Sequence, residues 1–297
     1  LLDLIRNAVN PKNMFFQYEH FTTNCATIPR DLLDQALGGY LKQQLNSQPS
    51  KRNYRYYVRE HMAYYPPLGF LLDVLMNSKL DQPMTKWHET FYPAKLSEYL
   101  SELPHIDDNQ KQTQHSLLGP KTSWVTSSST HHSKSGLFPL IFCLLSLSVL
   151  LMLMIATQAK KYHLTVVRII ARAYCVYWGL LSATLGLVML ISWLFSSHLD
   201  MHHNQNLLIF FVTDIIFAFF RVTVRNKHKE PLKNAWRNLP VLYMLIHIIA
   251  LIVYLLLSVT GVSEQNITST LYYLIPLQIG FFVWQWQLRS QAYIIER

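Results

Sequence analysis

Five apolar stretches in the second half of this chain constrain its fold more than any other feature. An α-helix needs about 20 apolar residues to cross roughly 30 Å of hydrocarbon, and four of the stretches are long enough. The third is short and contains Asp214. One buried helix of a soluble protein can mimic such a stretch, but five in series are typical of a membrane domain. The stretches cover residues 136–157, 173–197, 207–220, 240–261 and 271–288.

The first half of the chain has a different composition. Residues 1–135 are mixed and polar, whereas residues 136–297 are apolar blocks separated by short polar loops. We therefore expect a soluble domain at 1–135, followed by an all-α membrane domain of five transmembrane helices at 136–297. The chain begins at Leu1 without an initiator Met or an export signal, so we expect an N-terminally truncated or processed chain.

The basic residues predict how the membrane domain is oriented. The polar segments before the second and fourth stretches are rich in Lys and Arg, whereas loops 198–206 and 262–270 contain neither. By the positive-inside rule, these two loops and the N-terminal domain lie outside, and the C-terminus lies in the cytoplasm. The net charge of +9 is then mainly a topology signal. We expect a membrane as a partner and no nucleic acid.

The N-terminal domain is expected to mix strand and helix around Cys25. Residues 14–20 are strand-like, and residues 30–45 carry apolar residues at helical spacing. Gly38 and Gly39 are expected to end or kink that helix. Residues 54–75 form another helical candidate, interrupted at Pro66 and Pro67.

Cys25 is the candidate nucleophile. It is the only cysteine of the N-terminal domain, so it has no disulfide partner there. A strand before it and a helix after it would place the sulfur near a helix N-terminus, where the helix dipole favours a thiolate. Amide groups in the same turn would then help to hold an oxyanion. A buried structural cysteine remains the alternative interpretation of this spacing.

Several short motifs follow one another in the soluble half of the chain. They are FQY at 16–18, NCAT at 24–27, RDLLD at 30–34, YR at 54–55, DQPMT at 81–85 and FYPAKL at 91–96. In this order they resemble the Lnb-type periplasmic domain. The pattern around His198 and the Asn-x-Asn-Leu-Leu sequence at 204–208 resembles the membrane domain of the same family, so the resemblance extends over most of the chain.

The resemblance implies a fold and an activity. It implies an α+β papain-like domain, present here in part, exported to the periplasm and attached to a bacterial inner-membrane domain. It implies transfer of an acyl chain from a phospholipid donor, through a thioester on Cys25, to the α-amino group of a lipoprotein N-terminal cysteine. We expect no cofactor. The supporting residues of the cysteine segment are Asn24, Thr27, Arg30 and Asp31, and we expect Arg30 and Asp31 to orient it rather than to react.

The general base is less clearly marked in the sequence. The family's histidine is expected upstream of the cysteine in a Gly-His segment, but no Gly-His precedes Cys25. This absence fits a truncated chain, which we would expect to be inactive or nearly so for lack of that histidine. His20 is a possible base within the chain, and a surface or packing role is the alternative.

In the membrane domain we expect His198, Asn204, Asn206 and Asp214 to contact lipid or substrate. Asp214 is costly within a span, and His247 or a substrate amine would be a suitable partner. Metal binding at the cluster of His198, His202 and His203 would need a suitable third ligand, and Asp200 is the nearest. Headgroup or substrate contact explains this cluster as well, and we expect no metal.

Two other functions remain open. A cysteine amidase or peptidase acting on the cell envelope would use the same nucleophile but would not need five spans. A non-catalytic protein that binds lipid or lipoprotein would explain the missing histidine. Hydrolysis of soluble peptides would favour the first of these, and lipid binding that survives Cys25→Ser would favour the second.

Overall fold

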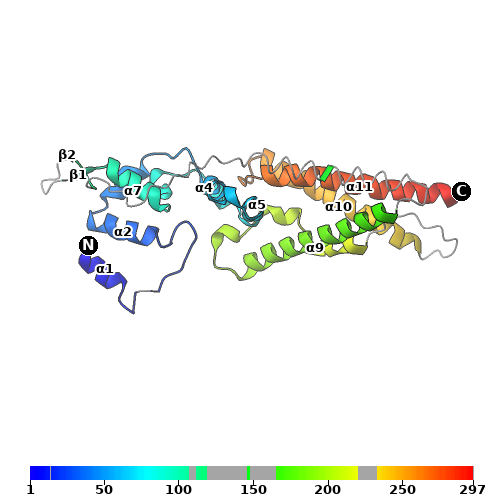
Figure 1. Cartoon of the computed structure of the whole chain (residues 1–297), viewed down its shortest axis with the longest axis horizontal. Helices are drawn as coiled ribbons and strands as arrows, with labels where there is room; N and C mark the ends of the chain where they lie inside the picture. Colours follow the sequence, from blue (N-terminus) through cyan, green and yellow to red (C-terminus); the bar gives the residue numbers. More distant parts are fainter. Residues whose placement is uncertain (14, 107–111, 119–145, 148–164, 220–232, 297) are drawn as a thin grey trace. The chain divides into compact units, whose positions relative to one another are not determined.

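The computed structural model describes residues 1–13, 15–106, 112–118, 146–147, 165–219 and 233–296 (Figure 1). The chain divides into two compact units. Unit 1 consists of Leu1–Glu60, Leu80–His132 and His198–Asp200. Unit 2 consists of His61–Lys79, Ser133–Ser197 and Met201–Arg297. The boundary expected between residues 135 and 136 lies outside the described residues and stays a prediction.

Unit 1 is built mainly from short helices. The described strands, β1 (Pro104–Ile106) and β2 (Gln112–Ser116), pair antiparallel. The 3-10 helix η2 (Ser78–Asp81) precedes α6 in the chain. The α-helices are α1 (Leu2–Ala8), α2 (Thr27–Ala36), α3 (Tyr40–Asn46), α4 (Tyr54–His61), α6 (Lys86–Glu89) and α7 (Pro93–Glu102).

The expected α+β papain-like fold is wrong. Helices account for 71% of the structure, and the two described strands have three and five residues. In the segment predicted as a strand, an isolated bridge joins Glu19 to Thr23. Phe15 is 81% exposed and Phe16 is 49% exposed, so these aromatic side chains have no sheet surface to cover. Strand propensity is expressed only where such a surface exists.

Two predicted helix boundaries are confirmed. Gly38 and Gly39 separate α2 from α3 with φ angles of 63° and 86°, a left-handed conformation that glycine adopts at little cost. Pro66 opens α5 (Pro66–Leu75) directly after the 3-10 helix η1 (Met62–Tyr64), because proline fits the first turn of a helix.

A small apolar core holds unit 1 together. Leu33 and Leu37 lie four residues apart at the end of α2 and pack on this core from one face of that helix. Leu41 is fully buried, so its truncation would leave a cavity. The buried core residues are Tyr40, Leu41, Leu45, Trp87, Tyr99, Leu100 and Leu103.

A buried carboxylate joins three segments of unit 1. Glu89 accepts hydrogen bonds from Ser50 Oγ at 2.6 Å, from Tyr57 OH at 2.7 Å and from Tyr99 OH. Burial acts to raise the pKa of Glu89, but these three donors outweigh it and hold that pKa below its ordinary value. The ionised carboxylate therefore stabilises the packing of α6 against α4 and α7.

An ion pair lies in the interior of unit 1. Arg55 Nε donates to Asp81 Oδ1 at 2.7 Å, and Arg55 Nη2 donates to Asp81 Oδ2 at 2.9 Å. The two side chains are 1% and 4% exposed. Because this bidentate pair fixes both direction and distance, it sets the position of α4 relative to η2.

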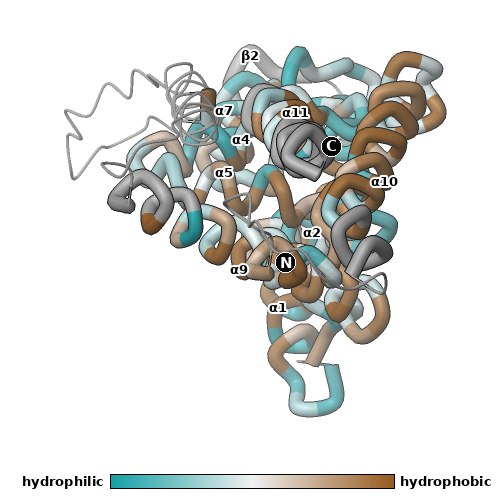
Figure 2. The backbone as a smooth tube through the Cα atoms, turned by 90° about the vertical axis from the view of Figure 1, so that its right-hand side faces the viewer, coloured by the Kyte–Doolittle hydropathy of each residue, from teal (hydrophilic) through white to brown (hydrophobic). Residues whose placement is uncertain are grey.

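Unit 2 contains the long helices. In Figure 2, α10 is coloured as hydrophobic along most of its length. The stretches Arg172–Phe195 and Leu239–Val259 are long and apolar enough to cross a membrane. Besides α5 and η1, the elements of this part of the chain are α9 (Thr165–Phe195), η4 (Leu199–Met201), η5 (Gln205–Leu208), η6 (Val212–Phe219), α10 (Lys233–Val259) and α11 (Thr268–Glu296).

The five expected spans have different outcomes. The second and fourth coincide with the apolar parts of α9 and α10. The fifth lies within α11, whose apolar section, Leu274–Trp286, is shorter. The third is not an α-helix, since its described residues form the end of η5 and then η6. The first, at 136–157, lies almost entirely outside the described residues.

Two glycines in α9 explain why the third stretch can pack as it does. A Cβ on Gly179 would lie 2.8 Å from the carbonyl oxygen of Asp214, and a Cβ on Gly186 would collide with the carbonyl oxygen of Phe210. Only glycine therefore lets the η5–η6 backbone approach α9 so closely. α9 therefore covers part of the η5–η6 backbone, which is not α-helical.

Candidate functional site

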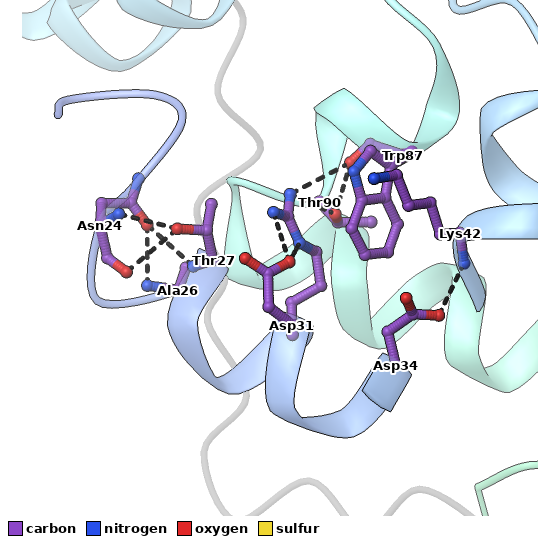
Figure 3. Close-up of polar contacts among 9 residues, drawn as sticks. Asn24, Ala26, Thr27, Asp31, Asp34, Lys42, Trp87 and Thr90 are labelled. Atoms are coloured by element: carbon purple, nitrogen blue, oxygen red, sulfur yellow. Dashed lines mark hydrogen bonds and ion pairs between the residues drawn. The ribbon is translucent and has the colours of Figure 1, made fainter. Parts of the chain in front are cut away.

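Cys25 is exposed and lies in the turn immediately before α2. The side chain of Asn24 fixes this turn: its Oδ1 accepts the backbone N–H groups of Ala26 at 2.8 Å and Thr27 at 3.0 Å (Figure 3). The backbone N–H of Asn24 donates in return to Thr27 Oγ1 at 2.7 Å. This reciprocal arrangement satisfies helix N–H groups that would otherwise lack partners. The prediction that Cys25 precedes a helix start is therefore confirmed.

Three amides of this turn, those of Ala26, Thr27 and Ile28, already donate hydrogen bonds within the turn. Asn24 takes those of Ala26 and Thr27, the amide of Ile28 donates to the Asn24 carbonyl at 3.1 Å, and Pro29 has no N–H. These three amides therefore have acceptors already, and the expectation that amides of this turn help to hold an oxyanion stays a prediction. Among the described residues, the Cys25 thiol has no hydrogen-bond partner.

Arg30 and Asp31 organise the other side of α2. The Arg30 guanidinium pairs with Asp31 Oδ1 at 2.7 Å and stacks over Trp87, with its Cζ 4.0 Å from the ring centre. It also reaches Thr90 Oγ1 at 3.4 Å (Figure 3). Arg30 is 6% exposed, so these contacts anchor the start of α2 on the core of unit 1.

The backbone around His20 belongs to the same turn system as Cys25. The bridge between Glu19 and Thr23 closes the loop, and Asn24 Nδ2 donates to the carbonyl oxygen of His20 at 2.9 Å. One asparagine therefore fixes both the helix start after Cys25 and the segment that carries His20.

The side chain of His20 pairs with a carboxylate from a distant part of the sequence. His20 Nδ1 lies 2.9 Å from Asp200 Oδ2, and the His20 ring lies 4.4 Å from that of His198. The side chain of Asp200 is 7% exposed, whereas that of His20 is 37% exposed. Because the carboxylate accepts the Nδ1 proton, the lone pair of a neutral His20 lies on Nε2.

An apolar groove runs between α1 and α2. It has a volume of about 670 Å³, a size typical of ligand pockets. Ile28 and Leu32 come from the first turns of the helix that follows Cys25. The groove residues are Ile5, Ala8, Val9, Asn13, Phe16, Ile28, Asp31, Leu32 and Gln35.

Asn204 and Asn206 lie in the interior of unit 2, with 3% and 1% exposed. Their side-chain amides donate to the Val74 carbonyl at 2.8 Å and 2.7 Å, near the end of α5. Tyr254 OH donates to Asn206 Oδ1 at 2.6 Å. The structure thus gives both residues protein partners, and the lipid or substrate contact expected of them stays a prediction.

Asp214 is also fully buried in unit 2. Its carboxylate accepts from Tyr243 OH at 2.7 Å and from the Phe211 amide at 3.1 Å, and His247 Nε2 lies 2.8 Å from it. Ser182 Oγ is a further donor. The expected contact between Asp214 and His247 is confirmed, while a contact with lipid or substrate stays a prediction. This network satisfies a charge that would be costly in an apolar interior.

Sequence reasoning missed two features of the site. It treated Asp200 only as the nearest carboxylate to the histidine cluster, although it pairs with His20. It also left α1 without a role, although α1 supplies one wall of the groove. In the sequence, the apolar residues Ile5 and Val9 lie four positions apart, a spacing that predicts an apolar helix face. Both side chains are exposed in the structure.

Comparisons with other proteins leave the chain without an assigned family. No protein-family model, curated protein or solved structure matches it. The resemblance of its motifs to the Lnb-type family therefore supports a proposal only, together with the residues around Cys25.

Proposed function

We propose that this chain is a membrane-bound acyltransferase of the bacterial envelope, related to the Lnb-type family, with Cys25 as the acyl carrier. The observation that carries the proposal is the exposed thiol of Cys25 on a turn that Asn24 fixes at the start of α2. A surface cysteine held in this way is available to a bulky lipid, whereas a structural cysteine would be buried.

The proposed reaction has two steps. The Cys25 thiolate attacks an ester carbonyl of a phospholipid, and the lysophospholipid leaves as an alcohol that takes up the thiol proton. The α-amino group of a lipoprotein N-terminal cysteine then attacks the thioester, so an amide forms and the thiol is regenerated. Dividing the transfer in this way replaces one difficult step by two easier ones.

We assign the proton transfers to His20. Its Nδ1 contact with Asp200 at 2.9 Å supports this role, because a carboxylate that holds one nitrogen directs the lone pair of the other outward. His20 and Cys25 also belong to one short segment that Asn24 connects. The hydrogen bond between base and nucleophile would form when substrate binds, since such bonds are often long without it.

The α1–α2 groove is proposed to hold the acyl chain. Its apolar residues Ile5, Val9, Ile28 and Leu32 suit hydrocarbon, and α2 begins two residues after the thiol. Burying a chain there would be favourable by about 0.8 kcal/mol for each methylene group removed from water.

We further propose the five-span topology, with unit 1 in the periplasm. The two apolar stretches of α9 and α10 support a membrane location. The third stretch enters this topology on its apolar sequence, since its 3-10 helix η6 has eight residues and would extend only about 16 Å at about 2.0 Å per residue. Impermeant thiol labelling of Ser197→Cys and Ser258→Cys should mark the outer face; labelling only from the cytoplasmic side would overturn this orientation.

Acyl transfer in vesicles tests the function. Vesicles that contain the full chain, a phospholipid with a labelled acyl chain and a diacylated lipopeptide should yield the triacylated product. Cys25→Ser should abolish transfer, and His20→Ala should lower it by about 10²- to 10⁴-fold. His61→Ala, which removes an exposed histidine elsewhere, should transfer as the wild type does. Equal transfer by wild type and Cys25→Ser would contradict the proposal.

Lipid binding without chemistry is the second candidate. The thiol's lack of a hydrogen-bond partner among the described residues favours it. Under this alternative, the wild type and the Cys25→Ser variant would bind phospholipid or lipopeptide equally well, but no triacylated product would ever form. Envelope peptidase activity would instead appear as cleavage of soluble peptides that depends on Cys25.

A further inference from the structure

Three potential metal ligands converge in unit 1. His20, His198 and Asp200 each offer one ligand atom, and these atoms lie within 4.8 Å of one another. We propose that the three side chains form a binding site for one divalent transition-metal ion of the zinc class. The sequence analysis considered a cluster of His198, His202 and His203 and expected no metal there, whereas the structure groups His198 and Asp200 with His20.

The ligand chemistry favours such an ion. Imidazole nitrogen with one carboxylate oxygen suits zinc and its neighbours, whereas calcium and magnesium prefer oxygen alone. Around a tetrahedral zinc ion with bonds of about 2.0–2.1 Å, ligand atoms lie about 3.4 Å apart. Ligand atoms that lie 4.8 Å apart would therefore have to approach each other by about 1.4 Å to bind zinc. Rotation of the side chains can supply this movement.

A buried oxygen of Asp200 gives independent support for a ligand. One carboxylate oxygen, Oδ2, contacts His20, but the other, Oδ1, is buried and has no hydrogen-bond partner among the described residues. A carboxylate oxygen left in this state is costly unless a cation or another donor reaches it. A metal ion between the two imidazoles would satisfy it.

Neighbouring groups already hold the ligands in place. Glu19 Oε2 lies 3.8 Å from His198 Nδ1. Asn24 Nδ2 holds the backbone of His20 through its carbonyl oxygen. Supporting contacts of this kind are typical of metal sites, where they fix the direction of the ligating side chains. The side chains of His20 and His198 are 37% and 30% exposed, so an ion can enter from solvent.

Metal binding would regulate Cys25, and this consequence rests on the proposed function. A metal bound at His20 Nδ1, the nitrogen that faces Asp200, leaves the proton of the neutral ring on Nε2, so Nε2 can no longer accept the thiol proton. Three protein ligands also leave one coordination position for water or an incoming group. The bound ion should therefore slow the acylation of Cys25, and removal of the ion should restore it.

Calorimetric titration with Zn²⁺ tests the site directly. The full chain, purified in detergent and treated with a chelator, should bind one Zn²⁺. His198→Ala and Asp200→Asn should each weaken binding by more than the 10- to 100-fold that loss of an outer supporting group causes. His203→Asn is the matched control, because it removes an exposed neighbouring histidine at φ 48°, a conformation that asparagine tolerates. It should bind as the wild type does.

The outcomes separate this site from the proposed function. Thermal unfolding without metal shows whether each variant is folded, and Cys25→Ser should keep full zinc affinity. Zinc affinity that is unchanged in both ligand variants, or lost in Cys25→Ser, would overturn the ligand set. Zinc binding without any acyl adduct on Cys25 would contradict the proposed function alone, and an adduct without zinc binding would contradict the metal site alone.

Discussion

Replacing Asn24 tests how the turn around Cys25 is held. Asn24→Ala removes the two bonds that Oδ1 accepts from Ala26 and Thr27 and the bond that Nδ2 donates to His20. Asn24→Asp keeps an acceptor for the helix amides but loses the donor to His20. The pair of variants therefore separates the helix cap from the anchoring of the His20 segment.

The expected magnitudes follow from these contacts. Loss of a helix cap costs about 1 kcal/mol, and loss of one buried hydrogen bond costs about 1 kcal/mol more. Asn24→Ala should therefore lower the local stability of the first turn of α2 by about 2 kcal/mol. Asn24→Asp should cost about 1 kcal/mol or less, because a carboxylate near a helix N-terminus is favourable.

Hydrogen exchange of the α2 amides measures this stability in the intact chain. A cost of about 2 kcal/mol corresponds to about 30-fold faster exchange in Asn24→Ala, and about 1 kcal/mol corresponds to about 5-fold in Asn24→Asp. The acylation of Cys25 should fall in the same order, since small displacements of a nucleophile are costly. Exchange in Asn24→Ala within about 2-fold of wild type would refute the capping argument.

Three further predictions concern the two units. The folded-state pKa of Glu89 is lowered, so its contribution to stability is complete above its unfolded pKa of about 4.5 and is lost as the pH falls through the folded value. The free energy of unfolding measured at pH 3–7 should show this loss, and Glu89→Gln should make that free energy depend less on pH. Arg55→Met should destabilise unit 1 by about 3–5 kcal/mol in denaturant, because it removes the bidentate cation from the buried Asp81 carboxylate, whereas a second change, Asp81→Leu, should restore most of that loss. Gly186→Ala should lower the thermal stability of the chain in detergent by about 1–3 kcal/mol, since its Cβ meets the Phe210 carbonyl; a wild-type melting temperature would show that α9 and η5–η6 are not in close contact.

The features predicted correctly were local ones. Hydropathy identified α9 and α10, and the Gly38–Gly39 and Pro66 signals placed helix boundaries, because these depend on a few neighbouring residues. The start of α2 after Cys25 was predicted for the same reason. The contact between Asp214 and His247 is not local; the sequence left His247 and a substrate amine open as partners, and the structure shows His247.

The features missed depend on contacts between distant residues. Phe15 and Phe16 have strand propensity, but they are exposed and no described strand pairs with them. His20 and Asp200 are separated by 180 positions, so spacing alone does not show that they meet. The 3-10 form of Val212–Phe219 depends on α9 glycines about 30 residues upstream, which apolar content does not report.

The mass of the chain after incubation with phospholipid tests the central claim most directly. If Cys25 carries the acyl group, the full chain should gain the mass of one acyl chain, and neutral hydroxylamine should release it, because thioesters react under conditions that leave oxygen esters largely intact. The adduct should map to the peptide that contains Cys25 and should be absent from Cys25→Ser. An unmodified mass under conditions of active transfer, or an adduct that persists in Cys25→Ser, would contradict the account.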